Sequence, residues 1–243
     1  MNNDASTQER ALLDQQIAYY RARAPEYDAW WFRTGRFDRG EANNAAWHRD
    51  TAAVERAVDT MLDTRRPSHV LEIACGTGLF TRRLAPRAAR VTAVDAAPEV
   101  LAINRDRVAA ANVDYVQADV FAFEPASRYD LVFMSFWLSH VPHPRFDAFF
   151  AMVRRALAPR GFAYIVDSAH DPTSHAVNHP TPDRDAGIVT RLLDDGRTFN
   201  IVKVFWEPPT LGVRLQAAGF DARIAATARY FIYGEARPLG ATG

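Results

Sequence analysis

Between residues 67 and 168, short runs rich in β-branched and aromatic residues alternate with runs of helical periodicity, and this alternation restricts the fold more than any other feature. The runs expected to be strands are His69–Ala74, Arg90–Asp95, Asp114–Gln117, Tyr129–Phe136 and Phe162–Asp167. The helices expected between them are 79–88, 98–110 and 145–158. Such alternation predicts an α/β fold with a parallel sheet, right-handed crossovers and helices on both faces. Ligands of these sheets bind beyond the carboxyl ends of the strands.

The flanking regions are expected to complete a single domain, 1–243. Residues 1–66 show helical spacing and are interpreted as an N-terminal helical cap. Residues 67–168 form the expected core, and 169–237 form a substrate-side segment followed by the last strands.

Within the carboxyl-terminal part, a helix is expected over 183–194 in a polar segment that contains prolines and histidines. Strands are expected over 198–206 and 220–233, and we expect these two to pair antiparallel at the sheet edge. The tail after Gly234 is expected to be frayed.

Charge and length exclude several classes of protein. Lysine plus arginine equals aspartate plus glutamate, at 29 each, so the basic excess typical of nucleic-acid-binding domains is absent. The longest apolar run, Leu131–Leu138, is far shorter than the roughly 20 residues of a membrane span. The N-terminus has no apolar region of the kind found in signal peptides. We therefore expect a cytoplasmic protein that binds neither nucleic acid nor membrane, as a monomer or a homodimer.

Two residue types that occur once exclude further chemistry. Cys75 is the only cysteine, which rules out an internal disulfide and sites built from several cysteines. Lys203 is the only lysine and lies in an alternating apolar run, which argues against a GxxxxGK[ST] phosphate loop and a Schiff-base lysine.

The most informative segment is Val70–Leu79, in which a buried strand leads through a glycine-rich turn into a helix. Gly76 and Gly78 allow a ligand to approach the backbone closely, and the following helix offers free N–H groups. Asp95 ends the next strand, where a carboxylate can accept hydrogen bonds from two ribose hydroxyls. The same aspartate could instead cap the helix that follows it.

A nicotinamide dinucleotide site is the alternative for such a turn. That site requires G-x-G-x-x-G/A, and here the third small position is Thr81, after the bulky Phe80. The turn also lacks a cation for a pyrophosphate.

The order of the motifs resembles that of the class I S-adenosylmethionine (SAM) dependent methyltransferases, in the small-molecule branch of methyltransferase type 11/25. The family's first motif, an acidic residue followed by G-x-G-x-G, matches Glu72–Gly78 with Ala74 in place of the first glycine. Asp95 matches the ribose-binding acid, and Asp119 in VQADVF matches the adenine-contacting acid. YDLVFMS and LAPRG match the fourth-strand motif and the turn before strand five.

This resemblance implies a Rossmann-like, doubly wound sheet of seven strands, mostly parallel with an antiparallel last strand, together with an N-terminal helical lid. It implies SAM as cofactor and S-adenosylhomocysteine as its product. The matching positions carry over as cofactor contacts: Glu72, Ala74, Gly76, Gly78, Asp95, Ala96, Asp119, Val120 and Ser135.

Methyl transfer is an in-line displacement that requires alignment and, for an acidic acceptor, removal of a proton. Residues after the fourth and fifth strands are the candidates for this chemistry. His140 is interpreted either as a general base or as a histidine that orients the substrate, and Asp167 is a second candidate catalytic residue. Trp137 and His143 are candidates for substrate binding beside His140.

Aromatic residues crowd the segment from Tyr19 to Phe37, and the adjacent Trp30 and Trp31 cannot share one face of a helix. We interpret the segment as a lid over cofactor and substrate. Trp31 is expected to contact the substrate, and Tyr20 or Arg33 the methionine carboxylate of SAM.

The histidines of residues 170–179 fit no helical face and lie among prolines. We expect a solvated, mobile loop there and no metal site.

These observations predict a SAM-dependent methyltransferase (EC 2.1.1.-) that acts on a small, aromatic or partly apolar acceptor, first at oxygen and next at nitrogen. An Asn/Asp-Pro-Pro-Tyr motif, which similar enzymes use on amide and nucleobase nitrogens, is absent. The alternatives are a methyltransferase that acts on RNA or protein, a nicotinamide-dependent oxidoreductase, and a SAM-binding protein without catalysis.

Overall fold

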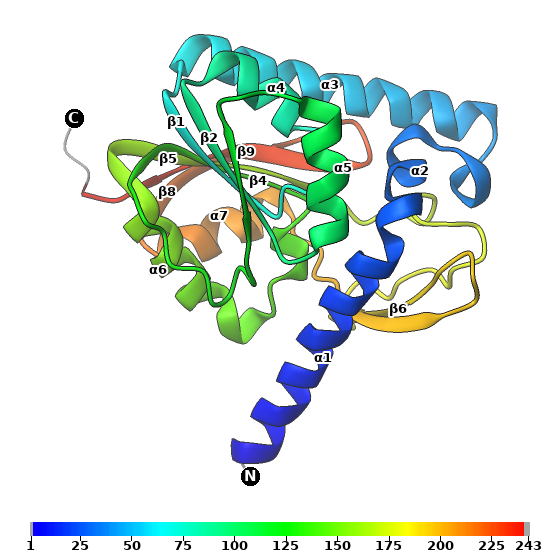
Figure 1. Ribbon diagram of the computed structural model, residues 1–243. Helices are drawn as coiled ribbons and strands as arrows, with labels where there is room; N and C mark the ends of the chain where they lie inside the picture. The colour runs from blue at the N-terminus through cyan, green and yellow to red at the C-terminus, as the bar shows by residue number, and fades with distance from the viewer. Residues whose placement is uncertain (1, 241–243) are drawn as a thin grey trace.

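A seven-stranded sheet forms the centre of the molecule (Figure 1). The computed structural model describes residues 2–240, and the side chains of residues 7–240. The strand order is β3-β2-β1-β4-β5-β9-β8. The strands are β1 (His69–Ile73), β2 (Arg90–Asp95), β3 (Val113–Gln117), β4 (Tyr129–Ser135), β5 (Leu157–Ser168), β8 (Phe220–Ala226) and β9 (Phe231–Pro238).

The direction of the strands confirms the predicted topology. β1 pairs in parallel with β2 on one side and β4 on the other, through registers such as Glu72↔Ala93 and Glu72↔Phe133. The last strand, β9, lies antiparallel between β5 and β8. From β1 to β3 the strands are added toward one edge of the sheet, and from β4 on they are added toward the other edge. A ligand site is expected at this reversal, between β1 and β4, in such folds.

Helices cover both faces of the sheet (Figure 1). α3 (Glu41–Arg65), α4 (Thr81–Leu84) and α5 (Pro98–Val108) pack on one face, through an apolar cluster that includes Trp47. α6 (Phe146–Ala156) and α7 (Pro208–Ala217) pack on the other. α6 buries Phe146, Phe149, Phe150 and Val153, which recur at helical spacing along one stripe.

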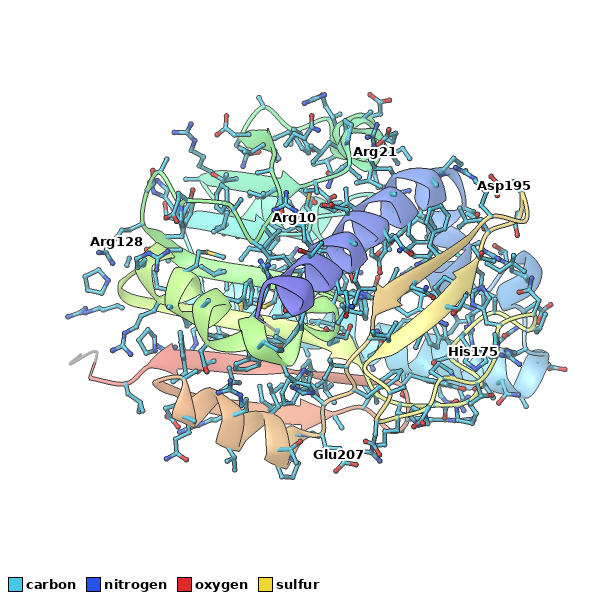
Figure 2. All side chains as sticks on the ribbon, turned by 90° about the horizontal axis from the view of Figure 1, so that it is seen from below. Arg10, Arg21, Arg128, His175, Asp195 and Glu207 are labelled. Carbon is cyan, nitrogen blue, oxygen red and sulfur yellow. The ribbon has the colours of Figure 1, made fainter. Side chains whose placement is uncertain are left out.

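The cap consists of two parts that are distant in sequence. α1 (Asn2–Arg23) and α2 (Tyr27–Phe32) come from the N-terminus, and the hairpin of β6 (Ile188–Leu192) and β7 (Thr198–Val202) follows β5. Figure 2 shows α1 lying alongside this hairpin. The Gln15 and Gln16 side-chain oxygens accept the N–H groups of Asn200 and Val202, so α1 satisfies one edge of β7.

Two predictions about the carboxyl-terminal half were wrong. The helix expected over 183–194 is strand β6, and the strand expected over 198–206 pairs with β6 rather than with the main sheet. Gly187 and Gly196 have positive φ angles of 67° and 86° and allow turns before β6 and between the strands. Residues 220–226 pair instead with β9.

The prediction that the tail is frayed after Gly234 was also wrong for the residues that belong to β9. β9 continues to Pro238 and pairs with β8 as far as Phe220↔Pro238. Residues 241–243 of the tail lie outside the described residues. No helix within the described part of the chain is both long and apolar enough to cross a membrane.

The close pairing of β8 and β9 makes Gly234 a strict requirement. A Cβ atom at this position would lie 2.0 Å from the Arg223 carbonyl oxygen and 2.8 Å from the Ile224 Cα. We expect Gly234→Ala to lower the free energy of unfolding by about 1–3 kcal/mol, because backbone atoms have no free volume to move into. Denaturant unfolding measures the change.

Gly212→Ala is the matched control, because a Cβ there would meet nothing within 4 Å and the residue lies inside α7. Alanine favours helix more than glycine does, so this variant should gain roughly 0.5–1 kcal/mol. Equal effects of the two substitutions would contradict the steric argument.

Candidate functional site

A cavity lies beyond the carboxyl ends of β1, β2 and β4. α1 forms its outer wall, through Leu13, Gln16, Ile17 and Tyr20. We call it the first cavity. The sequence-predicted residues that line it are Tyr20, Ala74, Gly76, Asp95, Ala96, Asp119, Val120, Ser135, Trp137 and His140.

The glycine turn is supported from beneath by a buried polar network. The Glu72 carboxyl accepts the Thr81 hydroxyl at 2.6 Å, and Thr81 Oγ1 in turn accepts the Asn104 amide at 2.8 Å. Asn104 also donates to the carbonyl oxygen of Gly76 at 3.1 Å. Glu72 therefore shapes the turn from below and does not itself line the first cavity.

Gly78 is required by the same network. Its φ angle is +88°, and a Cβ atom there would lie 2.7 Å from Asn104 Oδ1. The residue therefore allows α5 to approach the turn, and it does not line the first cavity. The small residue Ala74 also has a positive φ, 52°, at the start of the turn.

The first cavity carries negative charge. Asp95 accepts the N–H of Gly76 and the N–H of Ala97, both at 3.0 Å. Burial raises the pKa of Asp95, against the lowering effect of these backbone donors. Asp119 is the second carboxylate, and neither lysine nor arginine occurs among the described residues that line the cavity. The site therefore suits hydroxyl, amino and cationic groups and disfavours a pyrophosphate.

A second cavity lies between α1, α2 and the segment 168–205. Its charge is opposite. Arg23, Arg191 and Lys203 line it with His140, His175 and His179, and no carboxylate occurs among its described lining residues.

Two donors of the second cavity are buried without a partner. Within the described residues, Arg23 Nε and Arg191 Nη1 make no hydrogen bond. Lys203 Nζ donates to Ser139 Oγ at 2.8 Å and lies 3.9 Å from Asp167 Oδ1. Burial lowers the pKa of Lys203 to about 8, so the group stays largely protonated at neutral pH. Buried, unpaired donors are costly, and an anion would satisfy them.

The two cavities meet at four rings. Tyr20, Tyr27, Phe136 and His140 line both. Phe136 has a positive φ of 55°, which is uncommon for a bulky residue and is found mainly at functional sites. Its ring packs edge-on against Trp30 at 4.8 Å.

His140 has a defined hydrogen-bonding state. Its Nδ1 lies 2.7 Å from the Val202 carbonyl oxygen, and its Nε2 lies 2.6 Å from the Tyr20 hydroxyl. Since a carbonyl oxygen only accepts, the hydrogen is on Nδ1 and Nε2 accepts from Tyr20. Burial, followed by the charge of Lys203, lowers the pKa of His140 well below its usual range.

Four other predicted residues lie outside both cavities. Trp31 is buried in the core against Phe80 and Phe231. Arg33 is also buried and donates to the carbonyl oxygens of Thr173 and Ser174. The exposed His143 packs on Trp206. Asp167 accepts the N–H groups of Ser139 and Ser168 behind Lys203.

The segment expected to be a solvated, mobile loop is instead a wall of the second cavity. His175 and His179 are buried, and His179 Nε2 is bonded to Leu192 of β6. Trp30, Arg33 and Arg39 donate to carbonyl oxygens of residues 173–176, which fixes the segment to the N-terminal part of the chain. Among the described residues no group of three or more His, Cys, Asp or Glu side chains is arranged to hold a metal ion.

Sequence reasoning missed several residues of the site, among them Arg23, Asn104, Phe136, Arg191 and Lys203. Asn104 lies on the face of α5 that the glycine turn contacts, and helical spacing alone does not reveal that contact. Lys203 was noted as the only lysine, and its place in an apolar alternating run was the available signal of burial. Nothing in the sequence around Arg23 or Arg191 distinguishes them from surface arginines.

The buried Glu72 generates a prediction about pH. Burial raises the pKa of Glu72 to about 8, against the lowering effect of the Thr81 hydroxyl. The folded protein thus keeps a proton that the unfolded chain loses above the ordinary value of 4.5. The free energy of unfolding should therefore fall as pH rises from 4.5 to 8, by up to about 4 kcal/mol from this group.

Glu72→Gln, which still accepts the Thr81 hydroxyl, should remove this slope. Denaturant unfolding of the variant and the parent at pH 5 and pH 8 measures it. Glu41→Gln, at an exposed position on α3, is the control and should keep the parent's slope. A variant with an unchanged slope would show that Glu72 is ionised in the folded protein.

Comparison with known proteins agrees with this geometry. A family model described as a methyltransferase domain matches residues 70–161. The chain is similar to DhpI in complex with S-adenosylhomocysteine (SAH), at 36% identity and a TM-score of 0.76, covering 94% of this chain and 98% of that one. A complex of DhpI with SAM and HEP shows 38% identity and a TM-score of 0.73, with 93% and 98% covered.

Two curated relatives match over part of their length. A malonyl-[acyl-carrier protein] O-methyltransferase of Acetivibrio thermocellus is 38% identical over 73 residues, which are 29% of this chain and 26% of that protein. A ubiquinone biosynthesis O-methyltransferase of Xanthomonas axonopodis pv. citri is 31% identical over 158 residues, which are 63% of each protein. The chain thus spans less than two thirds of the length of either.

The family follows from the site and these matches together. The chain covers nearly all of a relative with which it shares 36% of its residues, and that relative was solved with SAH. The glycine turn and Asp95, which carried the resemblance, lie at the first cavity within the matched domain. The chain belongs to the class I small-molecule SAM-dependent methyltransferases.

Proposed function

We propose that the protein methylates an oxygen atom of a small anionic acceptor, which binds in the second cavity while SAM binds in the first. The observation that carries the proposal is the opposite charge of two cavities that share one wall. SAM supplies an electrophilic methyl group on a positively charged sulfur. The acceptor supplies an oxygen with negative charge.

The residues of the first cavity fit SAM. Asp95 has lone pairs left for ribose hydroxyls after accepting two backbone N–H groups. Asp119 and Val120 line the part of the cavity after β3, where the adenine amine would find an acceptor. Tyr27 faces Gly76 at the turn, and the Tyr27 ring is 3.8 Å from where a Gly76 Cβ would be. With Tyr20, Tyr27 is the candidate to contact the methionine moiety.

The second cavity favours an anion for a reason of charge balance. Arg23, Arg191 and Lys203 bring three cations into one buried space, and their partial lack of partners leaves donors free. A phosphate ester, a phosphonate or a carboxylate would pair with them. The expected aromatic or partly apolar character then applies to the rest of the acceptor, which would contact Phe37, Trp30 and Phe205.

Oxygen is the preferred acceptor atom because an oxyanion carries its nucleophilic electron pair at neutral pH. No proton has to be removed from it, which agrees with a His140 lone pair already used by Tyr20. Two of the curated relatives are named as O-methyltransferases, which supports the same choice. The negative first cavity argues against a nicotinamide dinucleotide. The second cavity lies between α1, α2 and the segment 168–205, which favours a small acceptor over RNA or protein.

Asp95 tests the cofactor site. Loss of a charged acceptor to a buried ligand costs roughly 1.5–3 kcal/mol, so Asp95→Ala should weaken SAM binding about 10- to 150-fold. Isothermal titration calorimetry measures the dissociation constant, and Asp114→Ala on the exposed part of β3 is the control. An unchanged constant in a folded Asp95→Ala variant would remove Asp95 from the site.

The cations test the acceptor site. Arg191→Met and Lys203→Met should each raise the KM of an anionic acceptor about 10- to 150-fold, since each removes a charge-assisted hydrogen bond. Their SAM dissociation constants should stay within about threefold of the parent, because neither residue lines the first cavity. Arg197→Met, at the exposed turn of the same hairpin, is the control.

The measurement is methyl transfer from SAM to a panel of phosphonates, phosphate monoesters and carboxylates, with their uncharged esters as comparison, followed by mass spectrometry. Inorganic phosphate should inhibit competitively against the acceptor and not against SAM. Equal turnover of charged and uncharged acceptors would contradict the proposal.

A further inference from the structure

The hydroxyl of Tyr20 lies where the two cavities meet, and its only hydrogen is already committed. Tyr20 lines both cavities and donates to His140 Nε2 at 2.6 Å. Among the described residues, no donor forms a hydrogen bond with the hydroxyl oxygen. That oxygen therefore presents only electron pairs to the space between the cavities.

His140 holds this arrangement in place. The Val202 carbonyl oxygen fixes the hydrogen of His140 on Nδ1, and Gln16 donates to the His140 carbonyl oxygen at 3.4 Å. The ring also packs edge-on against Tyr20, with 5.3 Å between centroids. The charged groups around the pair are Arg23 on α1, Arg191 on β6 and Lys203 after β7, and all three disfavour a positive charge on His140.

An oxygen with only electron pairs is unsuitable for binding an anion and suitable for contacting a positive group. In this site the positive group is the methyl on the sulfonium, whose C–H bonds are polarised. We propose that the Tyr20 oxygen accepts C–H···O contacts from the methyl group during transfer, and that His140 is a positioning residue that keeps the Tyr20 hydrogen turned away from the acceptor. This inference takes the identity of the acceptor, and nothing else, from the proposed function.

The chemical step requires no protein base. A lone pair of the acceptor oxygen forms the new C–O bond, while the C–S bond breaks and its electron pair goes to sulfur. The sulfonium becomes a neutral thioether, the acceptor loses one negative charge, and no proton moves. Tyr20 contributes by contacts that are strongest when the methyl carries most charge.

If His140 is removed, the Tyr20 hydroxyl can turn and donate to the acceptor oxygen. That bond would stabilise the bound acceptor and occupy a lone pair of the nucleophile. His140→Phe should therefore lower kcat about 3- to 30-fold and leave the acceptor KM equal or lower. If His140 were a general base, His140→Phe would instead lower kcat and abolish one limb of its pH profile.

Kinetics of four variants test this: Tyr20→Phe, His140→Phe, the double variant, and His140→Gln. Glutamine places an acceptor oxygen near the position of Nε2 and cannot serve as a base. We expect His140→Gln to keep kcat within about threefold of the parent, and the double variant to lose no more than Tyr20→Phe alone. Loss in His140→Gln as large as in His140→Phe, with a changed pH profile, would overturn the proposal in favour of a base.

A second measurement needs neither acceptor nor turnover. In the binary complex with [methyl-13C]SAM, the methyl proton resonance should lie downfield in the parent and in His140→Gln, and should shift upfield in Tyr20→Phe. An unchanged resonance and an unchanged kcat in Tyr20→Phe would exclude the contact, even if anionic acceptors are methylated. Conversely, the expected shift without any methylated anion would refute the proposed function and leave the Tyr20 contact supported.

Discussion

The hydrogen-bonded chain from Glu72 through Thr81 to Asn104 is the interaction on which the site depends. It is buried beneath the glycine turn and joins β1, α4 and α5 at the point where the strand order reverses. The turn has to pass over this chain closely, and for that reason Gly78 has no room for a side chain. The Glu72 carboxyl, the Thr81 hydroxyl and the Asn104 amide fill the space beneath the turn and hold it at the edge of the first cavity.

The two cavities are built from different kinds of structure. The first uses the ends of sheet strands, which are held by hydrogen bonds on both sides and by apolar residues on both faces. The second uses the cap, where arginines join irregular segments through carbonyl oxygens. Charge separates them further, with carboxylates in one and cations in the other. In the proposed function, the binding of a cationic donor and of an anionic acceptor is thus divided between the ends of the sheet strands and the cap.

The strands of the core and the acidic residues at their carboxyl ends could be predicted because their causes are local. Asp95 and Asp119 each follow an apolar strand directly, and a parallel sheet places all such positions at one edge. The hairpin of β6 and β7 could not be predicted, since one edge of β7 is bonded to residues of α1 that lie 185 and 186 positions away in sequence. The cations of the second cavity could not be predicted for the same reason, because their burial also depends on contacts between segments that are distant in sequence. Arg23 and Arg191 come together in the second cavity because α1 packs on the hairpin, and neither has a local pattern that indicates burial.

α1 contributes side chains to both cavities: Leu13, Gln16 and Ile17 to the first, Tyr19 and Arg23 to the second, and Tyr20 to both. An element that lines two binding sites can couple them thermodynamically. The free energy that one ligand expends in fixing the position of α1 need not be expended by the other, so each ligand raises the affinity of the other by the same factor. In the proposed function, donor and acceptor should therefore bind cooperatively. The two products, which lack the attraction between sulfonium and oxyanion, should then hold α1 less firmly and leave more readily.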